Sequence, residues 1–147
     1  MTLLHAATCV AIHGRALLIE GPSGSGKSML ALELIDRGAV LVGDDGVTLI
    51  ARQGQLFASP PPRIAGLLEV RNLGLLTFPT TQEVPVALVL RLDSEAPRYI
   101  EAAEPVELGG TKLPMVRVWP DGTGLALKAE LALRQFGNRH EDKSSGT

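Results

Sequence analysis

The chain has 147 residues, enough for one ordinary domain with a single hydrophobic core. Aliphatic side chains must fill that core, because hydrophobic residues make up 45% of the chain and aromatic residues only 3%. The formal net charge of −2 offers no broad basic surface for a nucleic-acid backbone, and few rings are present to stack on bases. Nucleic acid is therefore excluded as the expected partner.

The ends of the chain and its one cysteine indicate a cytoplasmic protein without a membrane anchor. The first residues lack the basic and apolar regions of a signal peptide, and no apolar run approaches the roughly 20 residues that span a bilayer. Cys9 is the single cysteine, so no intrachain disulfide can form. Residues 138–147 are small and polar, and we expect a disordered tail there after a single domain over residues 1–137.

The predicted elements alternate short strands with two helices. Residues 16–20 predict a buried strand, and residues 8–12 a hairpin partner across His13-Gly14. Residues 28–37 predict a helix that ends at Gly38, followed by strands at 39–42 and 47–51. Further strands are expected at 67–70, 73–78, 84–92 and 114–119, and a last helix at about 125–136. Strands outnumber helices and one strand-helix-strand crossover is visible, so we predict an α/β fold with a mixed, strand-rich sheet.

The strongest motif lies between the strand at 16–20 and the helix at 28–37. It matches G-x-x-x-x-G-K-[ST], the P-loop or Walker A motif, at every fixed position. Its residues are Gly21, Pro22, Ser23, Gly24, Ser25, Gly26, Lys27 and Ser28. The glycines allow backbone N–H groups to surround phosphate oxygens, Lys27 can reach the β- and γ-phosphates, and the Ser28 hydroxyl can bind Mg²⁺. The motif predicts a site for a nucleoside triphosphate.

Two aspartates follow the next predicted strand. In a parallel pairing, that strand would end beside the glycine loop and bring Asp44 and Asp45 to the γ-phosphate. One carboxylate could hold Mg²⁺, and the other could accept the proton of an attacking hydroxyl. The alternative is a simple Asp-Gly turn between two strands.

In these and neighbouring segments, the sequence resembles the catalytic domain of HPr kinase/phosphorylase, a bacterial enzyme that phosphorylates a serine of the phosphocarrier protein HPr. The resemblance covers residues 5 to about 136. It rests on four segments: Leu4-His5-Ala6-Ala7-Thr8 before the loop, the loop and helix through Leu41-Val42-Gly43-Asp44-Asp45-Gly46-Val47, the signature Leu68-Glu69-Val70-Arg71-Asn72-Leu73-Gly74-Leu75-Leu76, and Pro97-Arg98-Tyr99.

The resemblance implies a fold like that of HPr kinase and PEP carboxykinase, ATP and Mg²⁺ as cofactors, and HPr as protein partner. It implies that Lys27 binds phosphate, that Ser28 and Glu69 bind Mg²⁺, and that Asp45 is the base toward the protein serine. His5 and Arg98 take supporting roles by the same match. From the residues themselves, Asp44 is a further metal candidate, and Arg71 shares a strand face with Glu69, where it could neutralise transferred charge.

The family can also dephosphorylate HPr by phosphorolysis, and its members form homo-oligomers, often hexamers, which the resemblance implies here too. The usual N-terminal domain is absent, so we expect a short form with the catalytic domain alone. The segment 119–126 lacks the arginine that the family carries before its last helix. Two other functions stay open: a kinase of small molecules, and a regulatory module that senses ATP without transferring phosphate.

Overall fold

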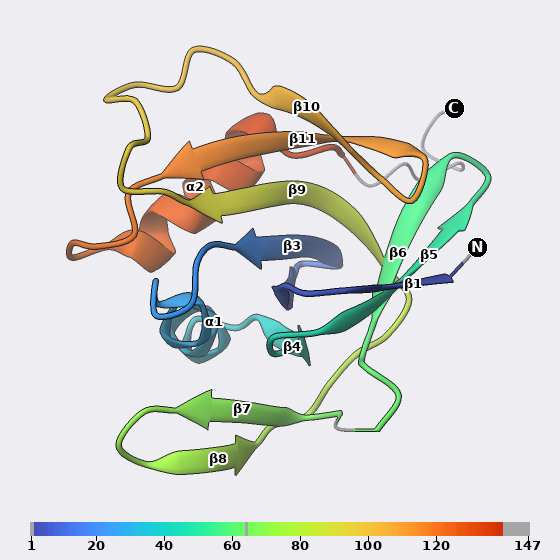
Figure 1. The fold of residues 1–147 in the computed structure, drawn as a ribbon, viewed down its shortest axis with the longest axis vertical. Helices are drawn as coiled ribbons and strands as arrows, with labels where there is room; N and C mark the ends of the chain where they lie inside the picture. The colour runs from blue at the N-terminus through green and yellow to red at the C-terminus, as the bar shows by residue number, and fades with distance from the viewer. Residues whose placement is uncertain (1, 64, 140–147) are drawn as a thin grey trace.

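A computed structural model describes residues 2–63 and 65–139 of the chain. Figure 1 shows a curved sheet with two helices on one face and a separate hairpin. The elements in chain order are β1 Thr2–His5, β2 Thr8–Ile12, β3 Arg15–Glu20, α1 Lys27–Asp36, β4 Val40–Gly43, β5 Val47–Arg52, β6 Gln55–Ser59, β7 Leu67–Val70, β8 Gly74–Thr77, β9 Val84–Leu92, β10 Glu104–Leu108, β11 Thr111–Val118 and α2 Leu125–Phe136.

The main sheet is mixed, which confirms the predicted fold class. Its strands follow the order β1-β5-β6-β9-β3-β2-β4, with β11 paired to β9 and β10 to β11. Strands β3, β9 and β11 are mutually parallel, whereas the other pairings are antiparallel. The three parallel strands end at one edge of the sheet, where β3 leads into the glycine loop.

The central strands are buried on both faces, which explains their nearly continuous apolar sequences. One hydrophobic cluster lies between the sheet and the two helices and includes Leu30, Leu34 and Leu133. A second cluster lies on the opposite face, where the curled strands β5 and β6 contribute Leu49 and Leu56. Strand β9 joins the two halves, because its start pairs with β6 and its remainder with β3 and β11 (Figure 1).

Three hairpins of the sheet use the same two-residue turn with two positive φ angles. The turns are His13-Gly14 (φ 51° and 79°), Gln53-Gly54 (φ 51° and 79°) and Gly109-Gly110 (φ 55° and 80°). This geometry matches the right-handed twist of the strands it connects. Only the first hairpin was predicted from the sequence; β6 and β10 were missed, although Gln-Gly and Gly-Gly were the available turn signals.

Strand β1 was also missed, because its four residues alternate only weakly between exposed and half-buried positions. It pairs with β5 at the end of the sheet and thereby holds His5 opposite Val47. The predicted helices and the other predicted strands are present, with boundaries that differ by up to three residues.

The direct parallel pairing considered for the strand before Asp44 does not form. Strand β4 pairs antiparallel with β2, and β2 pairs antiparallel with β3. Two antiparallel steps give β4 the same direction as β3, so its carboxyl end still reaches the edge of the sheet that carries the glycine loop. Strand β2 occupies the place beside β3 that a direct parallel pairing would have given to β4.

The chain remains attached to the sheet after α2. The backbone N–H of Asn138 donates to the carbonyl of Ala87 at 2.8 Å, and the carbonyl of Asn138 accepts from Arg15 at 3.0 Å. The predicted disordered tail begins at this residue, and its part from 140 to 147 lies outside the described residues. Among the described residues, no helix is long and apolar enough to cross a membrane.

The turn after β4 depends on Gly43, and Gly46 in the same turn provides a control position. A Cβ atom on Gly43 would collide with the carbonyl oxygen of Gly46 and lie 2.8 Å from Cγ1 of Val47, whereas a Cβ on Gly46 meets nothing within 4 Å. We predict that Gly43→Ala lowers the free energy of unfolding by about 1 to 3 kcal/mol, as overpacking does in other cores. Urea denaturation measures the change. Equal stability of Gly43→Ala and Gly46→Ala would contradict this account.

Candidate functional site

The glycine loop, residues 21–28, connects the end of β3 to the start of α1. Gly24 and Gly26 have φ angles of 82° and 99°, which side-chain-bearing residues rarely adopt. Gly26 is the residue before the helix and provides no side-chain hydrogen bond to its first turn. The first N–H groups of α1 thus point toward the loop with the positive end of the helix dipole, an arrangement that suits phosphate.

Lys27 lies across its own loop. Its Nζ donates hydrogen bonds to the carbonyls of Gly21 at 2.9 Å and Pro22 at 3.2 Å. The ammonium group is therefore held beside the first two residues of the loop. A phosphate bound there would accept the hydrogen bonds of the Lys27 ammonium group in place of these two carbonyls.

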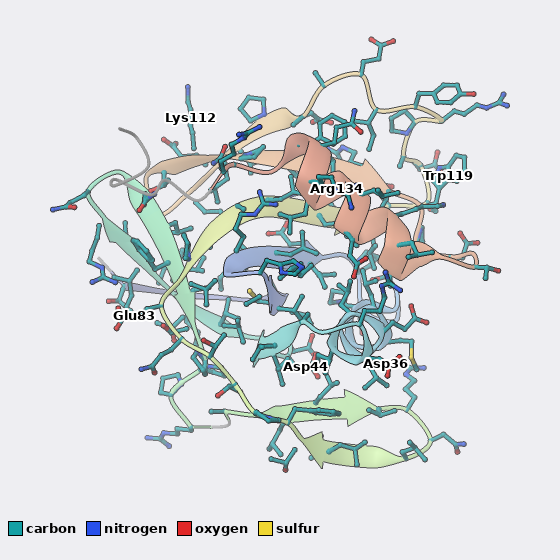
Figure 2. All side chains as sticks on the ribbon, turned by 180° about the vertical axis from the view of Figure 1, so that it is seen from behind. Asp36, Asp44, Glu83, Lys112, Trp119 and Arg134 are labelled. Atoms are coloured by element: carbon teal, nitrogen blue, oxygen red, sulfur yellow. The ribbon has the colours of Figure 1, made fainter. Side chains whose placement is uncertain are left out.

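Asp44 is the centre of the hydrogen-bond network at this edge. Its Oδ1 accepts from the hydroxyls of Ser28 at 2.7 Å and Thr8 at 3.0 Å, and its Oδ2 accepts from the backbone N–H of Glu69 at 3.0 Å. In Figure 2, Asp44 lies between α1 and the β7-β8 hairpin. One carboxylate therefore joins the start of α1, strand β2 and strand β7.

Asp45 lines a cavity of about 230 Å³ together with Lys27, Ser28, Glu69 and Arg71. Asp45 is exposed and has a φ angle of 59°, and its backbone N–H donates to the hydroxyl of Thr8 at 3.2 Å. Ser23, Gly24 and Gly26 of the glycine loop line the same cavity, so the structure brings eight predicted site residues together there, and Asp44 is hydrogen-bonded to one of them, Ser28. We call this the aspartate cavity.

His5 lies on the other side of the glycine loop, in a group of three polar residues with Glu20 and Arg91. Its Nε2 is 2.8 Å from Oε2 of Glu20, and Arg91 donates to Oε1 of Glu20 at 2.9 and 3.2 Å. Glu20 and Arg91 are paired across the parallel strands β3 and β9. All three residues line a second cavity of about 670 Å³, which shares Ser23 and Gly24 of the loop with the aspartate cavity.

The environment of Glu20 favours its ionised form. Burial raises the pKa of this carboxyl group, but the hydrogen bonds from His5 and Arg91 and the charges of both groups outweigh that effect and lower the pKa. Because the carboxylate is ionised and only accepts, the His5 ring donates to it through Nε2, which leaves Nδ1 for another partner.

Arg98 is not brought to either cavity. It is exposed on the segment between β9 and β10, and its guanidinium lies 5.5 Å from the centre of the Tyr99 ring. The indole N–H of Trp119, which Figure 2 labels, donates to the carbonyl of Ala96 at 2.7 Å and ties this segment to the turn before α2.

Sequence reasoning missed Thr8, Glu20 and Arg91. Each is a polar residue in an otherwise apolar strand or at its end, a signal that could have identified them, because buried polar groups need a partner. Thr8 is fully buried, and the side chains of Glu20 and Arg91 retain only 15% and 34% of their exposure.

The residues of the aspartate cavity fit a magnesium ion that is held together with phosphate. Ser28, Asp44 and Glu69 offer only hard oxygen donors, which Mg²⁺ prefers, and Mg²⁺ usually retains water and substrate phosphates as its other ligands. The described residues contain no group of three or more histidine, cysteine, aspartate or glutamate side chains arranged to hold a metal alone. The phosphate would therefore be part of the metal site.

Comparison with known proteins gives one consistent family. The model of the HPr Serine kinase C-terminal domain matches residues 1–83. HPr kinase/phosphorylase of Clostridium tetani is 47% identical over 79 residues, which are 54% of this chain and 26% of that protein. The enzyme of the same name from Cupriavidus pinatubonensis is 39% identical over 137 residues, covering 84% of this chain and 42% of that protein.

A solved structure of the Hpr(Ser) kinase/phosphatase from Coxiella burnetii superimposes with a TM-score of 0.80 and 26% sequence identity, covering 90% of this chain and 88% of that one. This chain spans 26% to 42% of the length of the two curated relatives. The structural likeness extends beyond the residues that the family model matches, because 90% of the chain is more than residues 1–83.

The lowered pKa of Glu20 predicts a pH-dependent contribution to stability. A carboxyl group with a lowered pKa in the folded state stabilises the fold above its ordinary pKa, and this stabilisation is lost as the pH falls through the lowered value. Glu20→Gln should therefore reduce the melting temperature at pH 7, and the difference from wild type should vanish in acid below the ordinary glutamate range. Glu107→Gln, at an exposed position of β10, is the control. A difference that persists unchanged into acid would contradict the assignment.

Proposed function

The chain belongs to the HPr Serine kinase C-terminal domain family, and we propose that it is an ATP- and Mg²⁺-dependent protein-serine kinase that phosphorylates HPr. The observation that carries the proposal is the convergence of the glycine loop, the Asp44-Asp45 pair and Glu69 on the aspartate cavity. A nucleotide-binding loop, oxygen ligands for a metal and a carboxylate free to act as a base are the parts that phosphoryl transfer to a hydroxyl requires.

In this proposal, backbone N–H groups of the loop from Ser23 to Ser28 bind the β- and γ-phosphates of ATP, and Lys27 leaves its carbonyl partners to bind the same oxygens. Ser28, Asp44 and Glu69 would hold Mg²⁺. When bound, the ion supplies neutralisation of the phosphate charge and orientation of the γ-phosphoryl group. Arg71, also on the aspartate cavity, adds positive charge on the side where the transferred group moves.

Asp45 is the proposed base. The serine hydroxyl oxygen of HPr forms a bond to the γ-phosphorus, the bond from that phosphorus to the bridging oxygen of ADP breaks, and the serine proton passes to the Asp45 carboxylate. Asp45 is exposed on the cavity wall, so a protein serine can reach it. Asp44 is less suited to this role, because both of its oxygens already accept hydrogen bonds.

The same residues could support dephosphorylation by phosphorolysis. An oxygen of inorganic phosphate would form a bond to the phosphorus of the phosphoserine, the bond from that phosphorus to the serine oxygen would break so that pyrophosphate leaves, and protonated Asp45 would give its proton to the serine oxygen. His5, whose Nδ1 is left for another partner, is placed to contact phosphate from the larger cavity. Arg98 would enter this reaction only through movement of the segment between β9 and β10 or through another subunit.

We further propose a cytoplasmic homo-oligomer, consistent with exposed apolar residues on β8 and α2 such as Leu75 and Leu131.

Transfer of labelled γ-phosphate from Mg-ATP to purified HPr tests the kinase. We expect wild type to label a serine of HPr, Lys27→Ala to lose both tight ATP binding and labelling, and Asp45→Asn to bind ATP but to label HPr at least about 100-fold more slowly, within the range for loss of a general base. Loss of labelling in both variants would identify the kinase and its base.

Three outcomes of the labelling experiment would contradict the proposal. ATP binding without HPr labelling would favour the ATP-sensing module, and labelling of a small molecule in the absence of HPr would favour a small-molecule kinase. Full labelling of HPr by Asp45→Asn would leave the fold assignment intact but remove Asp45 as the base.

Glu69 offers a separate test of the metal site. Glu69→Gln keeps the size of the side chain and the backbone N–H bond to Asp44, but it removes one charged oxygen donor from the aspartate cavity. We predict that the Mg²⁺ concentration needed for half-maximal labelling rises about 10- to 100-fold. Glu33→Gln, at an exposed position of α1 outside this cavity, should leave the Mg²⁺ requirement unchanged. An unaltered Mg²⁺ requirement in Glu69→Gln would exclude Glu69 as a ligand.

A further inference from the structure

Thr8 is an unusual residue for its position. It opens β2, a strand in which all five residues are buried, and its own side chain has no exposed surface. Among the described residues, Thr8 is the one polar or charged residue that is buried as a whole. A hydroxyl without a partner in such a place costs about 1 to 3 kcal/mol, so its contacts explain why the fold retains it.

The hydroxyl of Thr8 contacts both members of the aspartate pair. Oγ1 donates its proton to Oδ1 of Asp44 at 3.0 Å and accepts the backbone N–H of Asp45 at 3.2 Å. A hydroxyl has one proton to donate, so the bond to Asp44 determines that it acts as acceptor toward Asp45. Two neighbouring residues with different proposed tasks are therefore held by one oxygen atom.

The bond to Asp45 acts on a backbone that needs support. Asp45 has a φ angle of 59°, in the left-handed region, which costs energy for a residue with a side chain although aspartate tolerates it better than most. The N–H bond to Thr8 helps to keep this conformation, in which Asp45 lines the cavity with Lys27 and Ser28. A more extended backbone at Asp45 would turn its side chain in another direction.

Thr8 is well suited to serve as a fixed point. It is paired with Ile19 of β3 in the centre of the sheet, two residues before the glycine loop begins. Its β-branched side chain has few accessible rotamers, so the position of Oγ1 follows from the backbone of the sheet. The hydroxyl therefore fixes the turn at Asp44 and Asp45 relative to the rigid sheet.

We infer that Thr8 is a positioning residue for phosphoryl transfer: its hydroxyl holds the Asp44 carboxylate against Ser28 and the Asp45 backbone in the conformation that presents the base to the aspartate cavity. This inference rests on the proposed function. Thr8 does not line the cavity and does not itself contact a substrate there.

The test compares three variants with wild type. Thr8→Val keeps the shape of the side chain but removes the hydroxyl, Thr8→Ser keeps the hydroxyl, and Thr111→Val makes the same chemical change on β11, at the sheet edge away from the glycine loop. We expect Thr8→Val to lower kcat for HPr phosphorylation about 10- to 100-fold, the usual effect of losing a residue that orients catalytic ligands. The KM for ATP should change little, because the loop that binds the triphosphate is unaltered.

A second readout is independent of activity. Hydrogen exchange of the Asp45 amide, followed by nuclear magnetic resonance, should be faster in Thr8→Val than in wild type, because that N–H loses its acceptor. Thr8→Ser should restore both slow exchange and most of kcat, and Thr111→Val should resemble wild type in both. A role in packing alone would instead leave Thr8→Val, which keeps the shape of the side chain, close to wild type in kcat and in exchange, and would lower the stability of Thr8→Ser, which loses the buried methyl group.

The outcomes distinguish this inference from the proposed function. If wild type phosphorylates HPr and Thr8→Val matches it in kcat, the positioning role is wrong. If Thr8→Ser loses as much kcat as Thr8→Val, the hydroxyl is not the cause and the inference is also overturned. If wild type fails to phosphorylate HPr, the proposed function falls, and unchanged exchange of the Asp45 amide in Thr8→Val would then show that Thr8 does not hold this turn either.

Discussion

The site depends on one carboxylate. Asp44 accepts hydrogen bonds from the start of α1, from β2 and from β7, segments that are far apart in the sequence. Hydrogen bonds to a charged acceptor contribute about 1.5 to 3 kcal/mol each, and here they also determine geometry. The bond to Ser28 sets the first turn of the helix, and the bond to Glu69 sets the hairpin that carries a further carboxylate and an arginine. Without Asp44, these three segments would lose the one side chain that contacts all of them.

The sheet explains how Asp44 reaches this position. Strand β4 is separated from β3 by β2, yet it runs in the same direction and ends at the same edge. Gly43 permits the close approach of the Gly46 carbonyl, and the chain then turns back into β5. The hairpin β7-β8 forms a separate two-stranded sheet that packs on α1, and such a hairpin needs this support because two strands alone are marginally stable. The contacts that pack this hairpin on α1 therefore also hold Glu69 and Arg71 at the aspartate cavity.

The sequence predicted the elements with strong local signals. The glycine loop has a recognisable pattern, the central strands are continuous apolar runs, and the residues at 67–70 and 73–78 already predicted the two strands of the β7-β8 hairpin. What it did not predict depends on pairing. Three features depend on contacts between residues up to 71 positions apart, and no local pattern predicts those contacts. They are the order of β2 and β4, the pairing of β1, and the group formed by His5, Glu20 and Arg91. Arg98 was selected by resemblance, and the surrounding segment keeps it away from both cavities.

The pairing of β9 with both β3 and β6 affects the order in which parts of the protein fold. This strand supplies the parallel neighbour of β3 and the antiparallel neighbour of β6, and it follows β3 by more than sixty residues of chain. Closing so large a loop is entropically costly and slow compared with forming a hairpin. The loop at residues 21–28 is complete early during synthesis, but the sheet beneath it is not. The candidate site around this loop should therefore form late, once β9 has been synthesised and has inserted at the centre of the sheet.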